Sequence, residues 1–299
     1  MQITVFGATG FIGKELVKHL IEKDHKVAIV TRNKEKNLKI VGQSVTLYDY
    51  NLSSLLELIS QSEVIINLAG ENIGNGLWTK KRKQRILTSR INIGNLISQL
   101  CEKAEKKPRL LIQASATGFY GFNLHNTCNE NCPKGDGFLA DVCERWEQST
   151  ESVINSGIQR SVIRTGIVFG NSGGIIPKLL LPFRFLTSIL LGNGNNFLPW
   201  IHLDDEIRAI EHIITTPNPA KIYNLAAPEP VTMKDIIKEL SKTRNPIIRI
   251  TIPDKFLILI LGDLAKEMLL ANQRIKPMNL TNEGFKFKYN HLNSLITNL

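Results

Sequence analysis

The sequence is short of cysteine and of long apolar runs, and each shortage excludes a class of protein. Its four cysteines, Cys101, Cys128, Cys132 and Cys143, are scattered through 299 residues without a framework spacing. Cys128 and Cys132 stand four apart with no second cysteine pair to complete a zinc site, so no metal is expected. The longest apolar run, FLILILG from Phe256, is far too short to cross a bilayer and is better explained by a buried helix.

A leader segment is also missing, because an apolar strand-like run begins directly after Met1. A secretory signal would place a charged segment and a longer apolar run before such a strand. We therefore expect a cytoplasmic protein that is not held in a membrane.

Acidic residues are outnumbered, with 27 Asp and Glu against 37 Lys and Arg, a net charge of +10. The densest basic stretch is TKKRKQR at residues 79–85, and no aromatic residues are interleaved with it as a single-strand stacking surface would need. It is typical of a solvated helix face, so nucleic acid is disfavoured as a partner. A phosphorylated cofactor or substrate would use part of the same excess charge.

Short continuous apolar runs alternate with segments of helical periodicity up to about residue 170. This alternation predicts an α/β fold, a Rossmann-type doubly wound parallel sheet with helices on both faces. The expected strands are 2–6, 26–30, 44–48, 63–69, 109–115, 159–169 and 221–227, and the expected helices are 11–22, 53–60, 80–105 and 138–156.

After Phe169 the pattern changes to Gly, Asn and Pro around an apolar tract, and Pro-punctuated helices follow KIYNLAA. We expect a dinucleotide-binding domain at 1–170 plus 201–227, and a smaller C-terminal α/β substrate lobe at 171–200 plus 228–299. The ligand cleft would lie between them. The tract LLLPFRFLTSILL either lines the pocket or makes a subunit contact, and the oligomeric state stays open.

The run GATGFIG lies between the first strand and the first helix. Gly7 would allow the tight turn, Gly10 would let backbone approach a pyrophosphate, and Gly13 would let the helix pack closely on the sheet. The first amides of the helix then face the phosphates. The phosphate loop is predicted to comprise Gly7, Thr9, Gly10, Phe11, Ile12 and Gly13.

The end of the second strand indicates which dinucleotide is bound. A site for NAD usually has an acidic residue here, which holds the ribose 2′-hydroxyl. This strand is followed by Thr31 and Arg32. Because a guanidinium holds a 2′-phosphate that a carboxylate would repel, NADP(H) is the predicted cofactor.

Further motifs follow in a recognisable order. The chain resembles the extended, epimerase-like branch of the short-chain dehydrogenase/reductase superfamily. The motifs that carry this resemblance are GATGFIG, NLAG, SATGFYG, RTGIVFG and WIHLDDEIRAI. NLAGENIG, SGGIIPKLLLPFRF, AAPEPVT and GFKFKY are similar to the 39U group of epimerase-family proteins, and the resemblance covers essentially the whole chain.

The resemblance implies further cofactor contacts. Leu68, Ala69 and Gly70 would pass beneath the ribose and phosphates, although such residues also suit ordinary sheet core. Arg90 would meet the cofactor, with Arg85 a weaker candidate one turn earlier; the alternative for Arg90 is a surface salt bridge. The resemblance places Val168 beside the nicotinamide end.

A dehydrogenase of this superfamily needs a Tyr as general acid/base and a Lys four residues later. Those positions fall at Leu139 and Cys143, and neither side chain does the job. The remaining hydroxyl groups are those of Ser115, Thr117 and Tyr120, which are the catalytic candidates. Cys143 is either a reactive thiol facing the cofactor or, as we favour, a buried helix cysteine.

In WIHLDD, we expect Asp204 and Asp205 to cap a helix running from about Glu206, with His202 as a structural hinge residue.

Three functions stay open at this point. The first, which we favour, is an NADP(H)-dependent oxidoreductase or epimerase acting on an unknown small carbonyl or sugar-like substrate. The second is a non-catalytic NADPH-binding sensor whose lobes shift with the cofactor. The third is an RNA-associated protein that uses the basic surface.

Overall fold

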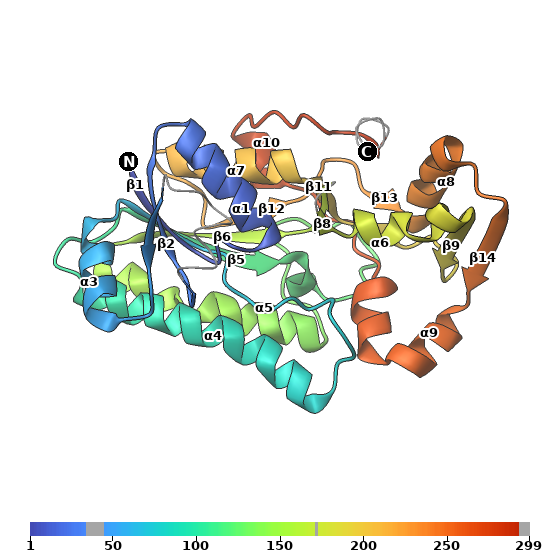
Figure 1. Ribbon diagram of the computed structural model, residues 1–299, viewed down its shortest axis with the longest axis horizontal. Coiled ribbons are helices and arrows are strands. Elements are labelled where there is room, and N and C mark those ends of the chain that lie inside the picture. Colours follow the sequence, from blue (N-terminus) through green and yellow to red (C-terminus); the bar gives the residue numbers. More distant parts are fainter. Residues whose placement is uncertain (34–44, 171–172, 293–299) are drawn as a thin grey trace.

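A seven-stranded, wholly parallel sheet forms the centre of the molecule in a computed structural model that describes residues 1–33, 45–170 and 173–292 (Figure 1). The strand order is β12–β6–β5–β4–β1–β2–β3. The strands are β1 (Gln2–Phe6), β2 (Lys26–Val30), β3 (Thr46–Tyr48), β4 (Val64–Asn67), β5 (Leu110–Ala116), β6 (Gln159–Thr165) and β12 (Ile222–Leu225). The prediction of a Rossmann-type doubly wound sheet is confirmed.

Helices cover both faces of this sheet (Figure 1). One face packs on α1 (Phe11–Glu22) and α7 (Leu203–Thr215). The other packs on α3 (Leu52–Gln61), α4 (Lys80–Lys103) and α5 (Phe138–Gln148). Burial on both faces explains why the strands read as continuous apolar runs: in β5, Leu110 faces one core and Leu111 the other.

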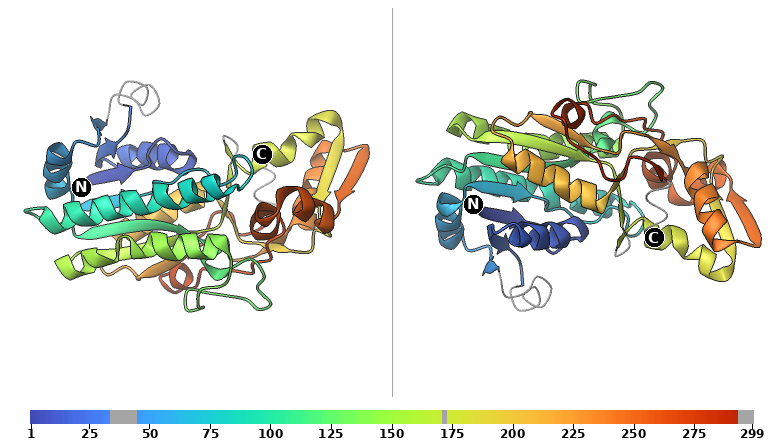
Figure 2. Two further views of the ribbon diagram at one scale, coloured as in Figure 1. Left: turned by 90° about the horizontal axis from the view of Figure 1, so that it is seen from below. Right: turned by 90° about the horizontal axis from the view of Figure 1, so that it is seen from above.

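A smaller lobe lies beyond one end of the sheet (Figure 2). Its own core contains Phe169, Phe183, Trp200 and Met233. The lobe's strands are β7 (Ile167–Gly170), β8 (Gly173–Gly174), β9 (Thr187–Leu191), β10 (Phe197–Leu198), β11 (Trp200–His202), β13 (Val231–Thr232) and β14 (Ile248–Ile252). Its helices are α6 (Ile176–Leu180), η3 (Pro182–Phe185), α8 (Met233–Arg244), α9 (Asp254–Leu261) and η4 (Ala265–Leu269).

The domain limits drawn from the sequence stay a prediction, and two later segments lie beside the large sheet. Helix α10 (Met278–Asn282) packs against β12. Phe285 and Phe287 pack on the core shared by α1 and α7. Residue 44 of an expected strand, and residues 171–172 and 293–299 of the expected lobe, lie outside the described residues.

Two predicted elements are interrupted. The strand expected over 159–169 ends at Thr165, and β7 pairs instead with β11 in a separate three-stranded sheet. Gly166 separates the two, because a β-carbon there would collide with the carbonyl oxygen of Pro199. The helix expected over 138–156 ends at Gln148, and a 3₁₀ turn, η2, covers Glu151–Ser156.

The prediction that FLILILG forms a buried helix is right about the helix and wrong about its burial. The segment is helical, as α9, but only Leu257 is buried among its residues. Phe256, Leu259 and Ile260 are exposed.

The start of α7 also differs from the expectation. The helix begins at Leu203, and His202 is its cap: its Nδ1 accepts a hydrogen bond from the N–H of Asp204 at 3.1 Å. Asp205 is buried and accepts backbone N–H groups of Lys288 and Tyr289. Asp205, one of the two aspartates expected to cap α7, therefore holds the segment at Lys288 and Tyr289 in place.

Two of the four cysteines are paired, which their spacing did not predict. Cys128 and Cys132 form a disulfide, whereas Cys101 and Cys143 are buried free thiols. Across residues 1–33, 45–170 and 173–292, no three His, Cys, Asp or Glu side chains are grouped as metal ligands. Over the same ranges, every helix is too short or too polar to cross a membrane.

Candidate functional site

The loop between β1 and α1 has the geometry that its glycines predicted. Gly7 has a φ of 81°, and a β-carbon on it would lie 2.6 Å from the carbonyl carbon of Leu68. Gly13 is buried, and a β-carbon there would collide with the backbone of Gly7. Gly10 caps α1 without a side-chain hydrogen bond. The first amides of α1 are thus not covered by a side-chain cap, which leaves room for an anion.

Thr9, Phe11 and Ile12 share this loop but differ in their surroundings. All three are partly buried. Phe11 packs its ring against the glycines of β8, where a β-carbon on Gly173 would lie 2.5 Å from the ring. The loop therefore touches the connection into the smaller lobe.

The segment after β4 continues from this loop toward the lobe. Leu68 and Ala69 lie against Gly7: a β-carbon on Gly7 would also lie 2.8 Å from the backbone nitrogen of Ala69. Gly70 follows, and a β-carbon on it would lie 3.0 Å from the Cζ atom of Arg90. Contacts thus run without a break from the start of α1 to the guanidinium of Arg90.

Arg90, on α4, is partly buried, and its guanidinium packs against protein atoms. Its Nη1 donates to the carbonyl oxygens of Ile86 at 2.9 Å and Glu71 at 3.1 Å. Its guanidinium lies 4.7 Å from the centre of the Trp146 ring. No carboxylate of the described residues forms an ion pair with it, so the salt bridge considered as an alternative is not formed. Burial lowers the pKa of Arg90 to about 10.

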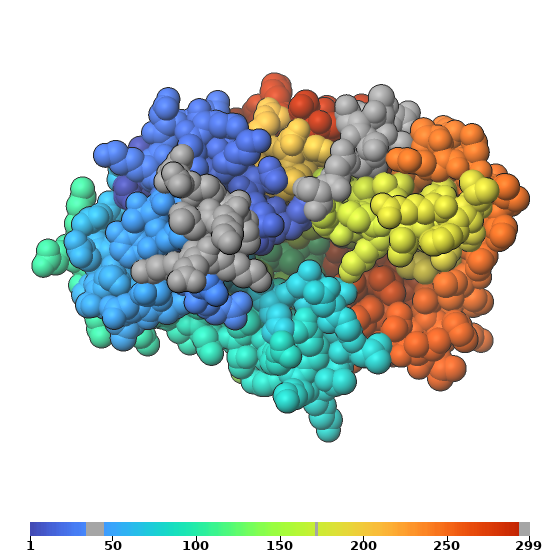
Figure 3. All heavy atoms as spheres, in the orientation of Figure 1, coloured from blue at the N-terminus to red at the C-terminus, as the bar shows by residue number. Residues whose placement is uncertain are grey.

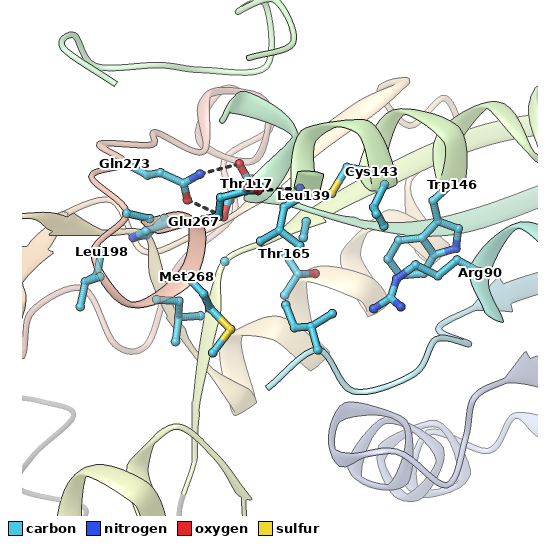
Figure 4. Close-up of a pocket in the computed structure, with 18 residues that line it drawn as sticks. Arg90, Thr117, Leu139, Cys143, Trp146, Thr165, Leu198, Glu267, Met268 and Gln273 are labelled. Atoms are coloured by element: carbon cyan, nitrogen blue, oxygen red, sulfur yellow. Dashed lines mark hydrogen bonds between the residues drawn. The ribbon is translucent and has the colours of Figure 1, made fainter. Parts of the chain in front are cut away.

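Arg90 borders a pocket between α5, the ends of β5 and β6, and the smaller lobe (Figure 4). The pocket holds about 140 Å³, and Figure 3 shows the surface hollowed where the two parts of the molecule meet. Most of the wall is apolar. Leu139, Val142, Leu198 and Met268 contribute to it.

Leu139 and Cys143, which the sequence resemblance placed at the Tyr and Lys positions, both line this pocket (Figure 4). Burial, with Glu147 nearby, raises the pKa of the Cys143 thiol to about 11. Cys143 is thus a buried cysteine of α5, and the raised pKa favours the protonated thiol at neutral pH.

The structure does not bring Ser115 or Tyr120 to the pocket. The Ser115 hydroxyl donates to the Glu147 carboxylate at 2.6 Å. The Tyr120 hydroxyl donates to Asn224 at 2.7 Å and accepts from Arg164 at 3.0 Å. Both side chains are buried, and burial raises the pKa of Tyr120. Their hydroxyl groups belong to an internal polar network away from the pocket wall, and a catalytic role for either stays a prediction.

Arg164 is the centre of that network. It donates from Nε and Nη2 to the two carboxylate oxygens of Glu147, each at 2.9 Å. Its guanidinium also lies 3.4 Å from the centre of the Phe119 ring. A buried bidentate pair of this kind holds β5, β6 and α5 in one arrangement.

Thr117 is the one catalytic candidate of the three that reaches the pocket wall. Its hydroxyl donates to the side chain of Gln273 at 3.2 Å. Gln273 in turn donates to the carbonyl oxygen of Thr117 at 3.0 Å. The pocket end of β5 is therefore held by a residue of the C-terminal region.

Sequence reasoning missed Glu267, which also lines the pocket. Its two carboxylate oxygens accept the backbone N–H groups of Phe138 at 2.9 Å and Leu139 at 2.8 Å. Gly137 makes room for it: φ there is 112°, and a β-carbon would lie 2.9 Å from Oε2. The glycine before the helix was the only local signal of this contact.

The remaining predicted cofactor residues lie at different depths. Thr31 is buried at the end of β2, and Arg32 beside it is exposed. The Arg85 guanidinium is 61% exposed and pairs with Glu71. Val168 is buried in the sheet core and is not part of the pocket wall, whereas its neighbour Ile167 is.

Comparisons with known proteins agree with this geometry. Residues 3–226 match the NAD dependent epimerase/dehydratase family, and residues 252–299 match a domain of unknown function, DUF1731. The chain is 33% identical to the epimerase family protein YfhF of Bacillus subtilis, over all of this chain and 98% of that one. It is 31% identical to the chloroplastic SDR39U1 homolog of Arabidopsis thaliana, over 98% and 84% of the two chains.

Solved structures show the same arrangement. The human epimerase family protein SDR39U1, crystallised with NADPH, superposes with a TM-score of 0.85 at 25% identity, covering 100% of this chain and 98% of that one. The UDP-glucuronic acid 4-epimerase of Bacillus cereus superposes with a TM-score of 0.79 over 99% and 97% of the chains, but at 17% identity this shows the fold alone. The chain belongs to the NAD dependent epimerase/dehydratase family and is related to its SDR39U1-like members.

Proposed function

We propose that this protein binds NADP(H) and is an oxidoreductase or epimerase, weak or specialised, that acts on a small carbonyl or sugar-like compound. The observation that carries the proposal is the unbroken line of contacts from the start of α1 through Gly70 to Arg90 and the pocket. The NADPH in the human relative's crystal structure supports the same cofactor.

The residues along this line suit a dinucleotide. The amides at the start of α1 would hold the pyrophosphate, because Gly10 places no side chain over them. Arg90 would meet a phosphate or ribose, since a buried guanidinium without a carboxylate partner favours an anion. The exposed Arg32 would hold the 2′-phosphate at the end of β2.

The pocket beyond Arg90 suits a small substrate with a mostly apolar surface. Bound NADPH would supply a hydride. Leu139, Leu198 and Met268 would exclude water from the reacting carbon. The hydroxyl group of Thr117 lies at the wall and would orient a carbonyl oxygen once it turns from Gln273. With Leu139 and Cys143 at the positions of the acid/base pair, proton delivery falls to bound water, and a reduction is slowed by roughly 10²–10⁴-fold.

One observation favours the second function, an NADPH-dependent sensor. Glu267 of the C-terminal region caps α5, the helix that lines the pocket. A cofactor bound beside α5 would then alter how that region sits, without any turnover. The enzyme and the sensor share the same cofactor site and differ only in whether the cofactor changes.

Purification without added nucleotide separates these functions. We expect the folded protein to retain an NADP species that mass spectrometry and an absorbance spectrum identify. If the bound cofactor changes its redox state during incubation with cell extract, the enzyme is supported; an unchanged cofactor supports the sensor. A protein that neither retains nor takes up NADP⁺ or NADPH on titration would refute both.

A further inference from the structure

The smaller lobe carries an apolar surface that residues 1–33, 45–170 and 173–292 leave exposed. The outer apolar face, as we call it, comprises Leu181, Phe185, Leu186, Ile247, Ile248, Ile250, Phe256, Leu259 and Ile260, all of them exposed. Leu259 is 81% exposed, Ile247 77% and Phe185 73%. These residues lie on η3 and the residues flanking it, on or beside β14, and on α9, at the end of the molecule away from β1–β3 (Figures 1 and 2).

The parts of this face adjoin one another along the chain and across it. The carbonyl oxygen of Leu186 accepts the N–H groups of Ile247 and Ile248. Ile248 and Ile250 share one face of β14 by the alternation of a strand. Helix α9 begins two residues after that strand ends, and Phe256, Leu259 and Ile260 follow at helical spacing.

Helix α9 has the composition of an element that is buried all round. Six of the eight residues of DKFLILIL are apolar, but only Leu257 is buried. Leu261 packs on a core cluster from a partly buried position, and Phe256, Leu259 and Ile260 are exposed. A helix that is hydrophobic on all sides is stable when both sides are covered. The composition therefore indicates that the exposed side of α9 is covered by something other than the described residues.

Strand β14 indicates which kind of partner contacts the outer apolar face. It pairs with β9 in a two-stranded sheet, and no strand in the described ranges pairs with its other edge. Its first four residues are exposed. An unpaired edge presents backbone N–H and C=O groups that a lipid surface cannot satisfy, whereas another strand satisfies them.

We propose that the outer apolar face joins two copies of this chain about a two-fold axis, with β14 antiparallel to β14 of the second copy. A register centred on Ile250 brings Ile248 opposite Ile252 of the second copy, so apolar side chains meet. The same register brings Arg249 opposite Thr251 of the second copy rather than opposite its own charge. The strand is thus complementary to itself, as an isologous contact requires.

The size of the face suits such a dimer. A fully exposed large apolar residue presents roughly 200 Å² of surface. The nine side chains of the outer apolar face are about half exposed or more, so together they present about 1,000 Å². Monomers seldom expose an apolar patch of more than about 300–600 Å². A stable interface takes about 800 Å² from each partner. Leu181, Phe185 and Leu186 belong to the tract LLLPFRFLTSILL, so the proposed dimer would give this tract the subunit contact that was one of its two expected roles.

Sedimentation velocity over a dilution series of the full chain tests the dimer. We expect wild type to sediment as a dimer, and Ile247→Glu/Leu259→Glu to sediment as a monomer that still unfolds in one cooperative transition, at a midpoint that no longer depends on protein concentration. Both sites are largely exposed, so the substitutions leave the fold intact. Leu52→Glu is the matched control: Leu52 is 63% exposed on α3, at the other end of the molecule, and this variant should remain dimeric.

A single cysteine tests the register. Ile250→Cys should form an intermolecular disulfide under mild oxidation, because antiparallel partners lie about 4.5–5.5 Å apart. Leu52→Cys should not form one. Wild type that stays monomeric up to about 100 µM, far above the dissociation constants of standard-size interfaces, would overturn the proposal, as would a dimer that survives the double substitution. A monomer that sediments with anionic phospholipid vesicles would overturn it in favour of a membrane contact.

Discussion

The carboxylate of Glu267 lies against Gly137 and closes the first turn of α5 across a sequence separation of more than 120 residues. The acceptor comes from a different part of the chain than the helix it caps. Helix α5 carries Leu139 and Cys143 into the pocket, so its position depends on the C-terminal region.

Replacing this cap should destabilise the protein. Glu267→Ala leaves the amides of Phe138 and Leu139 without their acceptor and removes a negative charge from the start of a helix. We expect a loss of about 1–2 kcal/mol in the free energy of unfolding, measured by urea denaturation. Glu57→Ala, on the exposed face of α3, is the control and should change stability by less than about 0.5 kcal/mol. Equal losses in the two variants would contradict the capping role.

Arg32 should decide between the two dinucleotides. Arg32→Glu brings a carboxylate to the 2′-phosphate, so NADPH binding should weaken by at least about tenfold, equivalent to about 1.4 kcal/mol, while NADH binding changes little. Calorimetric titration of each cofactor measures both. Lys18→Glu makes the same charge change on the exposed side of α1 and serves as the control. A loss of equal size for NADPH and NADH would reject the assignment of the 2′-phosphate to Arg32.

Arg90 should contribute more to cofactor binding than Arg85. Arg90 is partly buried beside the pocket, whereas Arg85 is mostly exposed and bound to Glu71. Arg90→Met should therefore weaken NADPH binding by about tenfold or more, and Arg85→Met by much less. Urea denaturation of both variants checks that each remains folded. Were Arg85→Met the more damaging change, the line of contacts through Gly70 would not describe the cofactor's path.

Glu206 should make the stability of the fold depend on pH. This carboxyl is fully buried on α7, and burial raises its pKa to about 8, while a hydrogen bond from Thr165 at 2.8 Å opposes the shift. Because the folded-state pKa exceeds the ordinary value of 4.5, the folded state holds a proton that the unfolded state releases. Stability is therefore greatest below the unfolded pKa and falls as pH rises toward 8, by at most about 1.4 kcal/mol per unit.

Glu206→Gln removes this dependence, since the amide is neutral at every pH. Urea denaturation at several pH values between 5 and 9 should show a falling midpoint for wild type and a flatter profile for the variant. Parallel profiles would show that Glu206 is ionised in the folded state.

Restoring the missing pair tests what the pocket lacks. Leu139 and Cys143 both face the pocket one turn apart, so Leu139→Tyr/Cys143→Lys places an acid and its cation where the superfamily has them. We expect a gain in NADPH oxidation with a simple ketone, read as loss of nicotinamide absorbance. Leu139→Tyr alone should gain less, because no ammonium lowers the tyrosine's pKa. No gain from the double variant would show that cofactor and substrate do not meet beside α5.

The large sheet could be predicted from the sequence because its strands are buried on both faces. The runs at 2–6 and 26–30 match β1 and β2 residue for residue. The glycines of the first loop were equally readable, since each role depends on its immediate neighbours. Elements whose conformation depends on neighbouring residues in the sequence, such as these strands and this loop, were therefore predicted well.

What failed depends on partners distant in sequence. The break at Gly166 is imposed by Pro199, and the cap of α5 comes from Glu267, so neither is visible in its own segment. Ser115 and Tyr120 sit where a catalytic hydroxyl belongs, but Arg164 and Glu147 turn both into network members. The buried helix expected from FLILILG was wrong about burial, because the apolar composition of α9 does not reveal that Phe256, Leu259 and Ile260 lie on the surface.

Asp205 links the molecule's middle to a much later segment. It is fully buried, and its two oxygens accept the backbone N–H groups of Lys288 and Tyr289, more than 80 residues away. During synthesis, α7 therefore cannot complete its contacts until residue 289 has left the ribosome. Domains commonly fold from the amino terminus while translation continues. In this protein, α7 obtains all of its contacts only after Lys288 and Tyr289 have been synthesised.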